Sequence, residues 1–166
     1  MPALLDGVVA LTAERQVQHW FAPAGDVAVV ERMPVIVWEA AEAVFYALRS
    51  AHGEVKVAVH HDGEHTTPDT VRRIVSHQEI AATRAVLQRY APMLAGEHRR
   101  AAVCLYTNSA DGHFVIDRHP VHGAVLVASP CSGFGFKFAS VVGEILADLL
   151  VDGTTRVDLT PFRIGR

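Results

Sequence analysis

Long apolar runs, basic tracts and cysteines are scarce in this chain of 166 residues. No stretch approaches about 18 consecutive apolar residues, so the sequence predicts no membrane span. The formal net charge is −3 with neutral histidines, and no basic cluster is present, which argues against nucleic-acid binding. The N-terminus lacks a charged segment followed by an apolar core, so no signal peptide is predicted. These absences together predict a soluble, cytoplasmic protein.

The composition is that of a folded domain. Half of the residues are hydrophobic and a fifth are charged, which is typical of a globular chain and not of a disordered one. The two cysteines, Cys104 and Cys131, could in principle form a disulfide. Two thiols fit a reducing compartment equally well, so the sequence leaves both states open.

The first half of the chain predicts an antiparallel meander followed by helices. Candidate strands are apolar or alternate loosely with period two, and they cover residues 16–22, 35–38, 43–48 and 55–60. Turns are expected at Ala51-His52-Gly53 and at Asp62-Gly63. Residues 67–77 predict a short helix that begins near Pro68.

A longer helix is expected after Ser76. Ser76 and Glu79 have capping-box spacing, and Pro92 marks the approach to the end of the helix. Its expected apolar face consists of Ile80, Ala81, Ala85, Val86 and Tyr90. The second half then predicts strands around Cys104, over 113–117 and over 123–129, the last buried on both faces. A helix over 136–150 is expected to end at Asp152-Gly153.

Two runs in the second half carry a family resemblance. Ala-Ala-Val-Cys-Leu-Tyr-Thr surrounds Cys104, and Ser-Pro-Cys-Ser-Gly-Phe-Gly-Phe-Lys-Phe-Ala covers residues 129–139. A lone strand cysteine is most often a small buried hydrophobe. In this context, with Asp-Gly-His-Phe-Val-Ile-Asp between the two runs, the chain resembles the C-terminal part of the monomeric sarcosine oxidase and N-methyltryptophan oxidase family of flavoproteins. The resemblance begins near residue 10 and extends to Arg166.

The resemblance implies a set of flavin-binding residues. Cys104 would carry FAD covalently, through a thioether to the 8α-methyl group, which requires an activated thiol. Gly133, Phe134, Gly135, Phe136 and Lys137 would pass the pyrimidine edge of the flavin ring, and Lys137 would also bind the substrate carboxylate. Glycines and helix-start amides permit such an approach, although the bare pattern equally fits an ordinary turn before a helix. Phe134 stands where the family usually has histidine.

The resemblance also implies catalytic and substrate-binding residues in the first half. Lys56 lies in an apolar strand, where a charge is costly unless it is exposed or used. The family places the matching lysine near the flavin N5 edge, where an ammonium would stabilise the charge that develops on dioxygen. His60 matches an active-site position, and Phe45 and Tyr46 match aromatic residues around the substrate. From the strand alone, Lys56 could face solvent, and Phe45 and Tyr46 would be core residues.

Neither a metal site nor a nucleotide fingerprint is predicted. His60, His61 and His65 have a spacing that fits no standard metal site, so solvated turn histidines are expected. The G-x-G-x-x-G run that holds the ADP half of FAD is missing, because Phe138 stands where Gly133 and Gly135 would require a third glycine.

We therefore predict an α+β chain. Residues 1–108 would form an antiparallel substrate-domain sheet with helices. Residues 109–166 would supply the closing strand and helix of an FAD-binding domain whose N-terminal Rossmann part is absent. The implied function is the C-terminal half of an FAD-dependent amine oxidase. It would oxidise N-methyl or other secondary amino acids with O2, giving an imine and hydrogen peroxide. The alternative is a non-catalytic remnant or interaction module that keeps the fold without flavin.

A covering partner is also expected. The strand over 124–129 and the helix after Lys137 would lack the nucleotide-binding sheet that covers them in the family, which would expose apolar surface and strand edges. An N-terminal FAD-binding partner chain, a second copy of this chain, or the chain's own tail could cover this surface.

Overall fold

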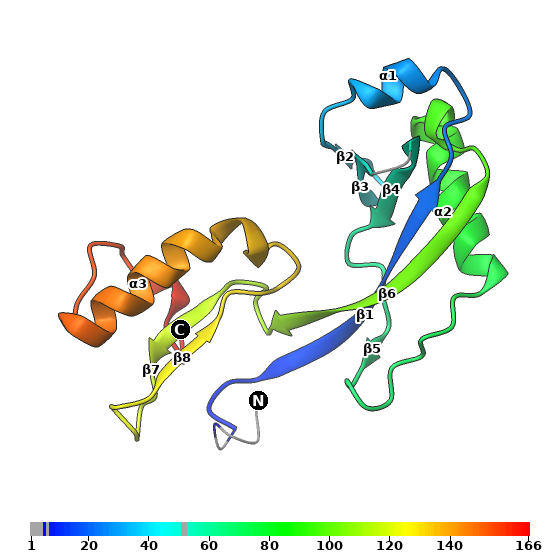
Figure 1. Cartoon of the computed structure of the whole chain (residues 1–166). Helices are drawn as coiled ribbons and strands as arrows, with labels where there is room; N and C mark the ends of the chain where they lie inside the picture. Colours follow the sequence, from blue (N-terminus) through cyan, green and yellow to red (C-terminus); the bar gives the residue numbers. More distant parts are fainter. Residues whose placement is uncertain (1–4, 6, 51–52) are drawn as a thin grey trace. The chain divides into compact units, whose positions relative to one another are not determined.

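The computed structural model describes residue 5, residues 7–50 and residues 53–166 (Figure 1). Two compact units are present, one made of residues 14–105 and one made of the segment up to Ala13 together with residues 106–166. Both contain antiparallel strands and few helices, which confirms the α+β prediction. The change of unit after Leu105 lies near the expected boundary at residue 108. The identity of the two parts as substrate and FAD-binding domains stays a prediction.

The unit of residues 14–105 is built on one sheet. Its strand order is β2 (Ile36–Glu39), β3 (Val44–Arg49), β4 (Val55–Val59), β1 (Leu11–Phe21) and β5 (His65–Thr66), and β6 (His98–Ser109) also pairs with β1. The pairs β2–β3, β3–β4 and β4–β1 are antiparallel. The predicted meander is confirmed for β2, β3 and β4, but its first strand is misplaced, because β1 pairs with β4 and not with β2. Ala51 and His52 of the expected turn lie outside the described residues, whereas Gly53 is described and has φ +71°. A short helix α1 (Val27–Glu31) links β1 to β2.

Helix α2 (His77–Tyr90) begins with the predicted capping box. Ser76 Oγ accepts a hydrogen bond from the backbone N–H of Glu79, and the Glu79 carboxylate accepts one from the N–H of Ser76. The predicted apolar face is partly wrong, because Ala81 and Ala85 are exposed and the buried residues are Thr83 and Leu87. Leu87 buries far more apolar area than an alanine does, so packing against the sheet decides which face of α2 turns inward.

The core of this unit fixes which side of each strand faces inward. Its buried members come from the sheet, from α1, from α2 with its C-cap Ala91, and from the 3₁₀ turn Pro92–Leu94: Phe21, Val30, Phe45, Ala47, Val55, Val57, Leu87, Ala91 and Leu94. Because side chains alternate along a strand, the neighbours Trp20, Tyr46 and Lys56 lie on the opposite face of the sheet.

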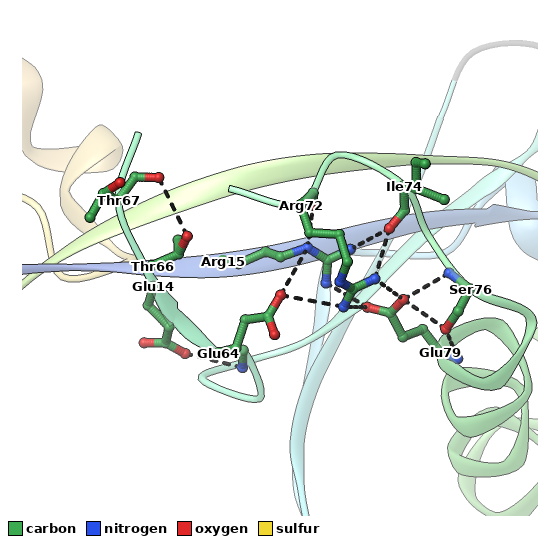
Figure 2. A network of polar contacts seen from close by, with 10 residues as sticks. Glu14, Arg15, Glu64, Thr66, Thr67, Arg72, Ile74, Ser76 and Glu79 are labelled. Atoms are coloured by element: carbon green, nitrogen blue, oxygen red, sulfur yellow. Dashed lines mark hydrogen bonds and ion pairs between the residues drawn. The ribbon is translucent and has the colours of Figure 1, made fainter. Parts of the chain in front are cut away.

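The helix predicted over residues 67–77 is wrong, since this segment has no regular secondary structure before α2. The carbonyls that a helix would use are bound instead by a side chain from β1. Arg15 donates from Nε to the carbonyl oxygen of Arg72 at 2.6 Å and from Nη2 to that of Ile74 at 3.0 Å (Figure 2). A long-range contact that no local pattern reveals thus holds the segment in an irregular path.

Arg15 belongs to a wider ionic network. Its guanidinium is 3% exposed and also binds the carboxylate of Glu79 (Figure 2). Glu79 accepts further hydrogen bonds from Arg72 and Ser76. Partial burial by itself would raise the pKa of Glu79, but the bonds from Arg72, Ser76 and Arg15 outweigh it and hold that pKa far below its usual range. The network therefore carries its charges at neutral pH.

The second unit is a hairpin covered on both faces. Strands β7 (Val115–Arg118) and β8 (Leu126–Ser129) pair antiparallel. Helix α3 (Ala139–Val151) follows the 3₁₀ turn η4 (Gly135–Phe138) and lies over this hairpin (Figure 1). Its Val142, Ile145 and Leu149 pack with Phe114 and Ile116. A separate cluster joins Val115 and Val127 to Leu5, Val9 and the C-terminal Ile164. The N-terminal segment and the tail of the chain thus pack on its own hairpin.

Two expectations for this unit have different outcomes. The helix ends as predicted, with Asp152 as C-cap and Gly153 at φ +76°. The strand expected over 123–129 is shorter, and burial alternates along β8 instead of covering both faces equally. The chain ends after a short 3₁₀ turn at Thr160–Phe162. Over the described ranges, no helix is long and apolar enough to cross a membrane.

Two histidines meet inside the first unit. His19 on β1 is 1% exposed, and its Nδ1 lies 3.3 Å from Nε2 of His98 on β6. Phe21 packs against both rings. Burial first, and then the neighbouring His98, lower the pKa of His19 to about 4. The pKa of His98 is also lowered, by its burial and by Arg84.

Acidification is expected to destabilise this unit through His19. The folded state resists a proton that the unfolded chain takes up with a pKa of 6.5, so the stability is fully present above pH 6.5 and is lost as pH falls towards about 4. The loss amounts to about 3 kcal/mol in the free energy of unfolding. Urea unfolding at pH 7 and pH 4.5 should show a smaller pH effect in His19→Phe than in the unmodified chain. The exposed-site control His77→Gln should keep the full effect, and equal pH effects in all three proteins would refute the assignment.

Candidate active site

Lys56 is the second residue of β4, on the face of the sheet opposite the core. It is half-buried, and its cross-strand neighbours are Leu48 on β3 and Trp20 on β1. Its ammonium lies 5.7 Å from the centroid of the Trp20 ring. In the part of the chain that the structure describes, this ammonium takes part in no ion pair and no hydrogen bond. Lys56 is therefore a cation whose N–H donors can reach a ligand.

The two predicted aromatic residues point to different sides of the sheet. Phe45 is fully buried and stacks on Trp38, with ring centroids 4.7 Å apart. Tyr46 is half-buried and pairs with Ala58, so it lies on the same face as Lys56. A substrate contact by Tyr46 stays a prediction, whereas Phe45 occupies the core position that its strand pattern also allowed.

His60 follows directly after β4. Its backbone N–H donates to the carbonyl oxygen of Val44, and its ring lies 4.2 Å from that of His61, measured between centroids. Nδ1 of His61 lies 3.0 Å from Oε2 of Glu14. Among residues 5, 7–50 and 53–166, no three or more His, Cys, Asp and Glu side chains are arranged to hold a metal ion.

Cys104 lies within β6 and is half-buried. Cys131, before the glycine turn, is half-buried as well, and both thiols are free. Of the two states that the sequence left open, the structure has the reduced one.

The turn over residues 132–137 is backbone-determined. Ser132 is 1% exposed with φ 50°, and its N–H donates to the carbonyl oxygen of Thr107 at 2.9 Å. Gly133 follows at φ +84°. A Cβ on Gly135 would lie 1.6 Å from the carbonyl oxygen of Pro130, so only glycine fits there. The chain can thereby enter helix α3 with a tightly fixed path.

Lys137 and its neighbours form an exposed aromatic patch. Phe136 is 96% exposed, and the Phe134 ring stacks on Phe114 with centroids 5.0 Å apart. The Lys137 ammonium lies 5.9 Å from the Phe134 ring and 5.6 Å from the Phe138 ring. Neither η4 nor α3 has a side-chain cap, and the N–H of Ala139, the first residue of α3, donates to the carbonyl oxygen of Phe136.

The predicted residues therefore fall into two groups. Lys56, His60, Phe45, Tyr46 and Cys104 belong to the unit of residues 14–105, and the turn over 133–137 belongs to the other. Sequence reasoning did not identify two neighbours of Lys56. They are Trp20, whose ring lies beside the ammonium, and Arg100, whose guanidinium carbon lies 3.8 Å from the centroid of the same ring. The period-two pattern of residues 16–22 places Trp20 opposite the core side, but its pairing with Lys56 depends on a strand register that the sequence alone does not show.

The residues present fit one part of FAD. In the unit of residues 14–105, the free thiol of Cys104 and the ammonium of Lys56 have the chemistry that a covalent attachment and a polar edge of a flavin require. In the other unit, the glycine turn and the ammonium of Lys137 suit the carbonyl edge of such a ring. The ADP half of FAD finds no glycine fingerprint in this sequence.

Comparisons with known proteins show the family of the chain. Residues 4–149 match the family model described as FAD dependent oxidoreductase (DAO). Monomeric sarcosine oxidase of Streptomyces avermitilis is 45% identical over 159 residues, covering 92% of this chain and 41% of the relative. N-methyl-L-tryptophan oxidase of Salmonella arizonae is 35% identical over 155 residues, with the same two coverages. The fold matches glycine oxidase from Geobacillus kaustophilus with a TM-score of 0.75 at 16% identity, over 95% of this chain and 40% of that one.

The chain belongs to the FAD-dependent oxidoreductase (DAO) family. It spans about two fifths of the length of the curated relatives it matches.

Proposed function

We propose that this chain is the substrate- and flavin-facing half of an FAD-dependent amine oxidase that acts on N-methyl or other secondary amino acids. One observation carries the proposal. The chain has only two lysines among its 15 Lys and Arg residues, and they are Lys56 and Lys137. Each ammonium lies beside aromatic rings, and neither pairs with a described carboxylate. Free cations therefore stand at both positions where the resemblance requires one.

Each residue has a distinct role in the proposal. Bound FAD supplies the redox chemistry, taking a hydride from a carbon next to the amine nitrogen and delivering two electrons and two protons to O2. Lys137 and the backbone amides after Gly133 bind the substrate carboxylate and the flavin edge. Lys56 stabilises negative charge that develops on dioxygen, and Tyr46 and His60 line the substrate side. Cys104 would hold the flavin through a thioether to the 8α-methyl group; the thiol and the methyl group would each lose one hydrogen, and O2 would take up the two electrons and two protons.

A second chain is part of the proposal. Exposed apolar side chains remain on and before α3, including Phe136 at 96%, Val151 at 81% and Leu150 at 70% exposure. Exposed apolar side chains at both ends of a helix favour an association site. We propose that an N-terminal FAD-binding chain occupies it in the completed enzyme, and a second copy of this chain is the rival occupant.

Co-expression tests the function directly. The chain would be produced with the part of Streptomyces avermitilis monomeric sarcosine oxidase that precedes the matched region. The expected product is a yellow complex whose flavin is bleached by sarcosine or another N-methyl amino acid without oxygen, and which releases hydrogen peroxide in air. A flavin-containing complex that no N-methyl or secondary amino acid reduces would reject the oxidase. A folded chain that never takes up flavin would favour the non-catalytic module.

A further inference from the structure

Lys56 has an unusual environment for a lysine on a half-buried strand. Its ammonium contacts the ring of Trp20, 5.7 Å from the centroid, and the two residues are directly paired across β1 and β4. A cation within about 6 Å of an indole centroid is attracted by the ring quadrupole. An aspartate or glutamate in the place of Trp20 would also hold the lysine, but its negative charge would offset the charge of the ammonium.

The Trp20 ring itself is firmly held. It is 8% exposed, and its Nε1–H donates to Ser50 Oγ at 3.2 Å. The guanidinium carbon of Arg100 lies 3.8 Å from the ring centroid, and Arg100 is tied to Glu54 by an ion pair of 3.1 Å. The indole is thus fixed by a hydrogen bond at one edge and by a paired arginine over the ring. A fixed ring gives a flexible lysine side chain a defined place to lie.

We propose that Trp20 is a positioning residue for Lys56, which holds the ammonium at a fixed place without neutralising it. This rests on the proposed role of Lys56 toward dioxygen. A preorganised charge stabilises a developing anion without the cost of reorganising at the moment of reaction. Removing the indole leaves the charge of Lys56 in place but frees its side chain. The loss should therefore fall on the oxygen reaction and not on the reaction with substrate.

The first test needs no flavin, because it observes the lysine side chains directly. The chain has only two lysines, so each signal can be assigned. With [ε-13C]lysine, the full chain gives two ε-methylene signals, one from Lys56 and one from Lys137. The signal of Lys56 should be displaced upfield by the ring current of Trp20. In Trp20→Leu it should move to the position of a free lysine, while that of Lys137 stays unchanged. The matched control Trp38→Leu, which removes the other tryptophan of the same sheet, should leave both signals in place.

A conservative variant keeps this test valid if Trp20→Leu does not fold. Trp20→Phe retains a smaller, less electron-rich ring and should leave the Lys56 signal between the two extremes. If the Lys56 signal is the same in the unmodified chain and in a folded Trp20→Phe or Trp20→Leu variant, the positioning role is wrong. This outcome is independent of whether the completed protein is an oxidase.

The second test uses the completed, flavin-loaded complex. Trp20→Leu should slow flavin reoxidation by O2 about tenfold, and the rate of flavin reduction by substrate should stay within about twofold. Trp20→Phe should recover most of the reoxidation rate. Equal slowing of both half-reactions would overturn the proposal by indicating a general structural effect. A complex that substrate never reduces would reject the oxidase function instead, while the lysine signals still decide the role of Trp20.

Discussion

Replacing Cys104 with serine is expected to abolish covalent flavin in the completed enzyme. A thiolate is the nucleophile that this attachment needs, and a serine hydroxyl does not ionise at neutral pH without a dedicated base. After acid precipitation, the unmodified complex should retain its yellow colour in the protein pellet. The Cys104→Ser complex should release all of its flavin to the supernatant.

Cys131→Ser is the matched control for this prediction. Both thiols are free and half-buried, so the two variants remove the same group from comparable environments. The Cys131 variant should keep flavin in the pellet. Flavin that stays with the Cys104→Ser protein, or that is lost from the Cys131→Ser protein instead, would reject the assignment of the tether to Cys104.

Replacing Lys56 with methionine is expected to slow reoxidation of the flavin by O2 about a hundredfold or more. Methionine preserves the length of the side chain but removes the positive charge of the ammonium. Loss of one fixed charge from a water-poor site removes roughly a few kcal/mol of transition-state stabilisation. Stopped-flow absorbance separates the two half-reactions, and flavin reduction by substrate should change little.

Lys137→Met provides the contrasting variant. Its ammonium lies beside the Phe134 and Phe138 rings next to the glycine turn, where the proposal places the substrate carboxylate. This variant should raise KM and slow reduction while it leaves the oxygen reaction nearly unchanged. If Lys56→Met and Lys137→Met slow the same half-reaction, the division of labour between the two lysines is wrong.

Local signals in the sequence predicted local structure well. The capping box of Ser76 and Glu79 involves atoms three residues apart, so the sequence contains all that is needed to begin α2. The helix predicted for the preceding segment was wrong, because the carbonyls of Arg72 and Ile74 bind Arg15, which lies more than fifty positions away in the sequence. Pro68 is compatible with a helix start, but a long-range hydrogen bond overrode the local preference.

The candidate site shows the same contrast between what local patterns reveal and what long-range contacts decide. Cys104, Lys56 and Lys137 were found through the resemblance, since a strand cysteine or lysine alone has a bland interpretation. Phe45 and Tyr46 are adjacent on one strand, and the period of two means that only one of them can share the face of Lys56. The contact between Trp20 and Lys56 required the register of β1 and β4, which forms only when distant segments pair.

The Arg15 network separates rapid amide exchange from backbone mobility, two properties that usually occur together. In the described structure, none of the backbone N–H groups of residues 71–75 donates a hydrogen bond, so these amides are open to hydrogen exchange with water. Their carbonyl side is nevertheless held by a buried guanidinium, which fixes the path of the segment. Rapid amide exchange in this stretch would therefore signal missing donors and not a wandering backbone. A truly loose segment would appear only after the Arg15 side chain is removed.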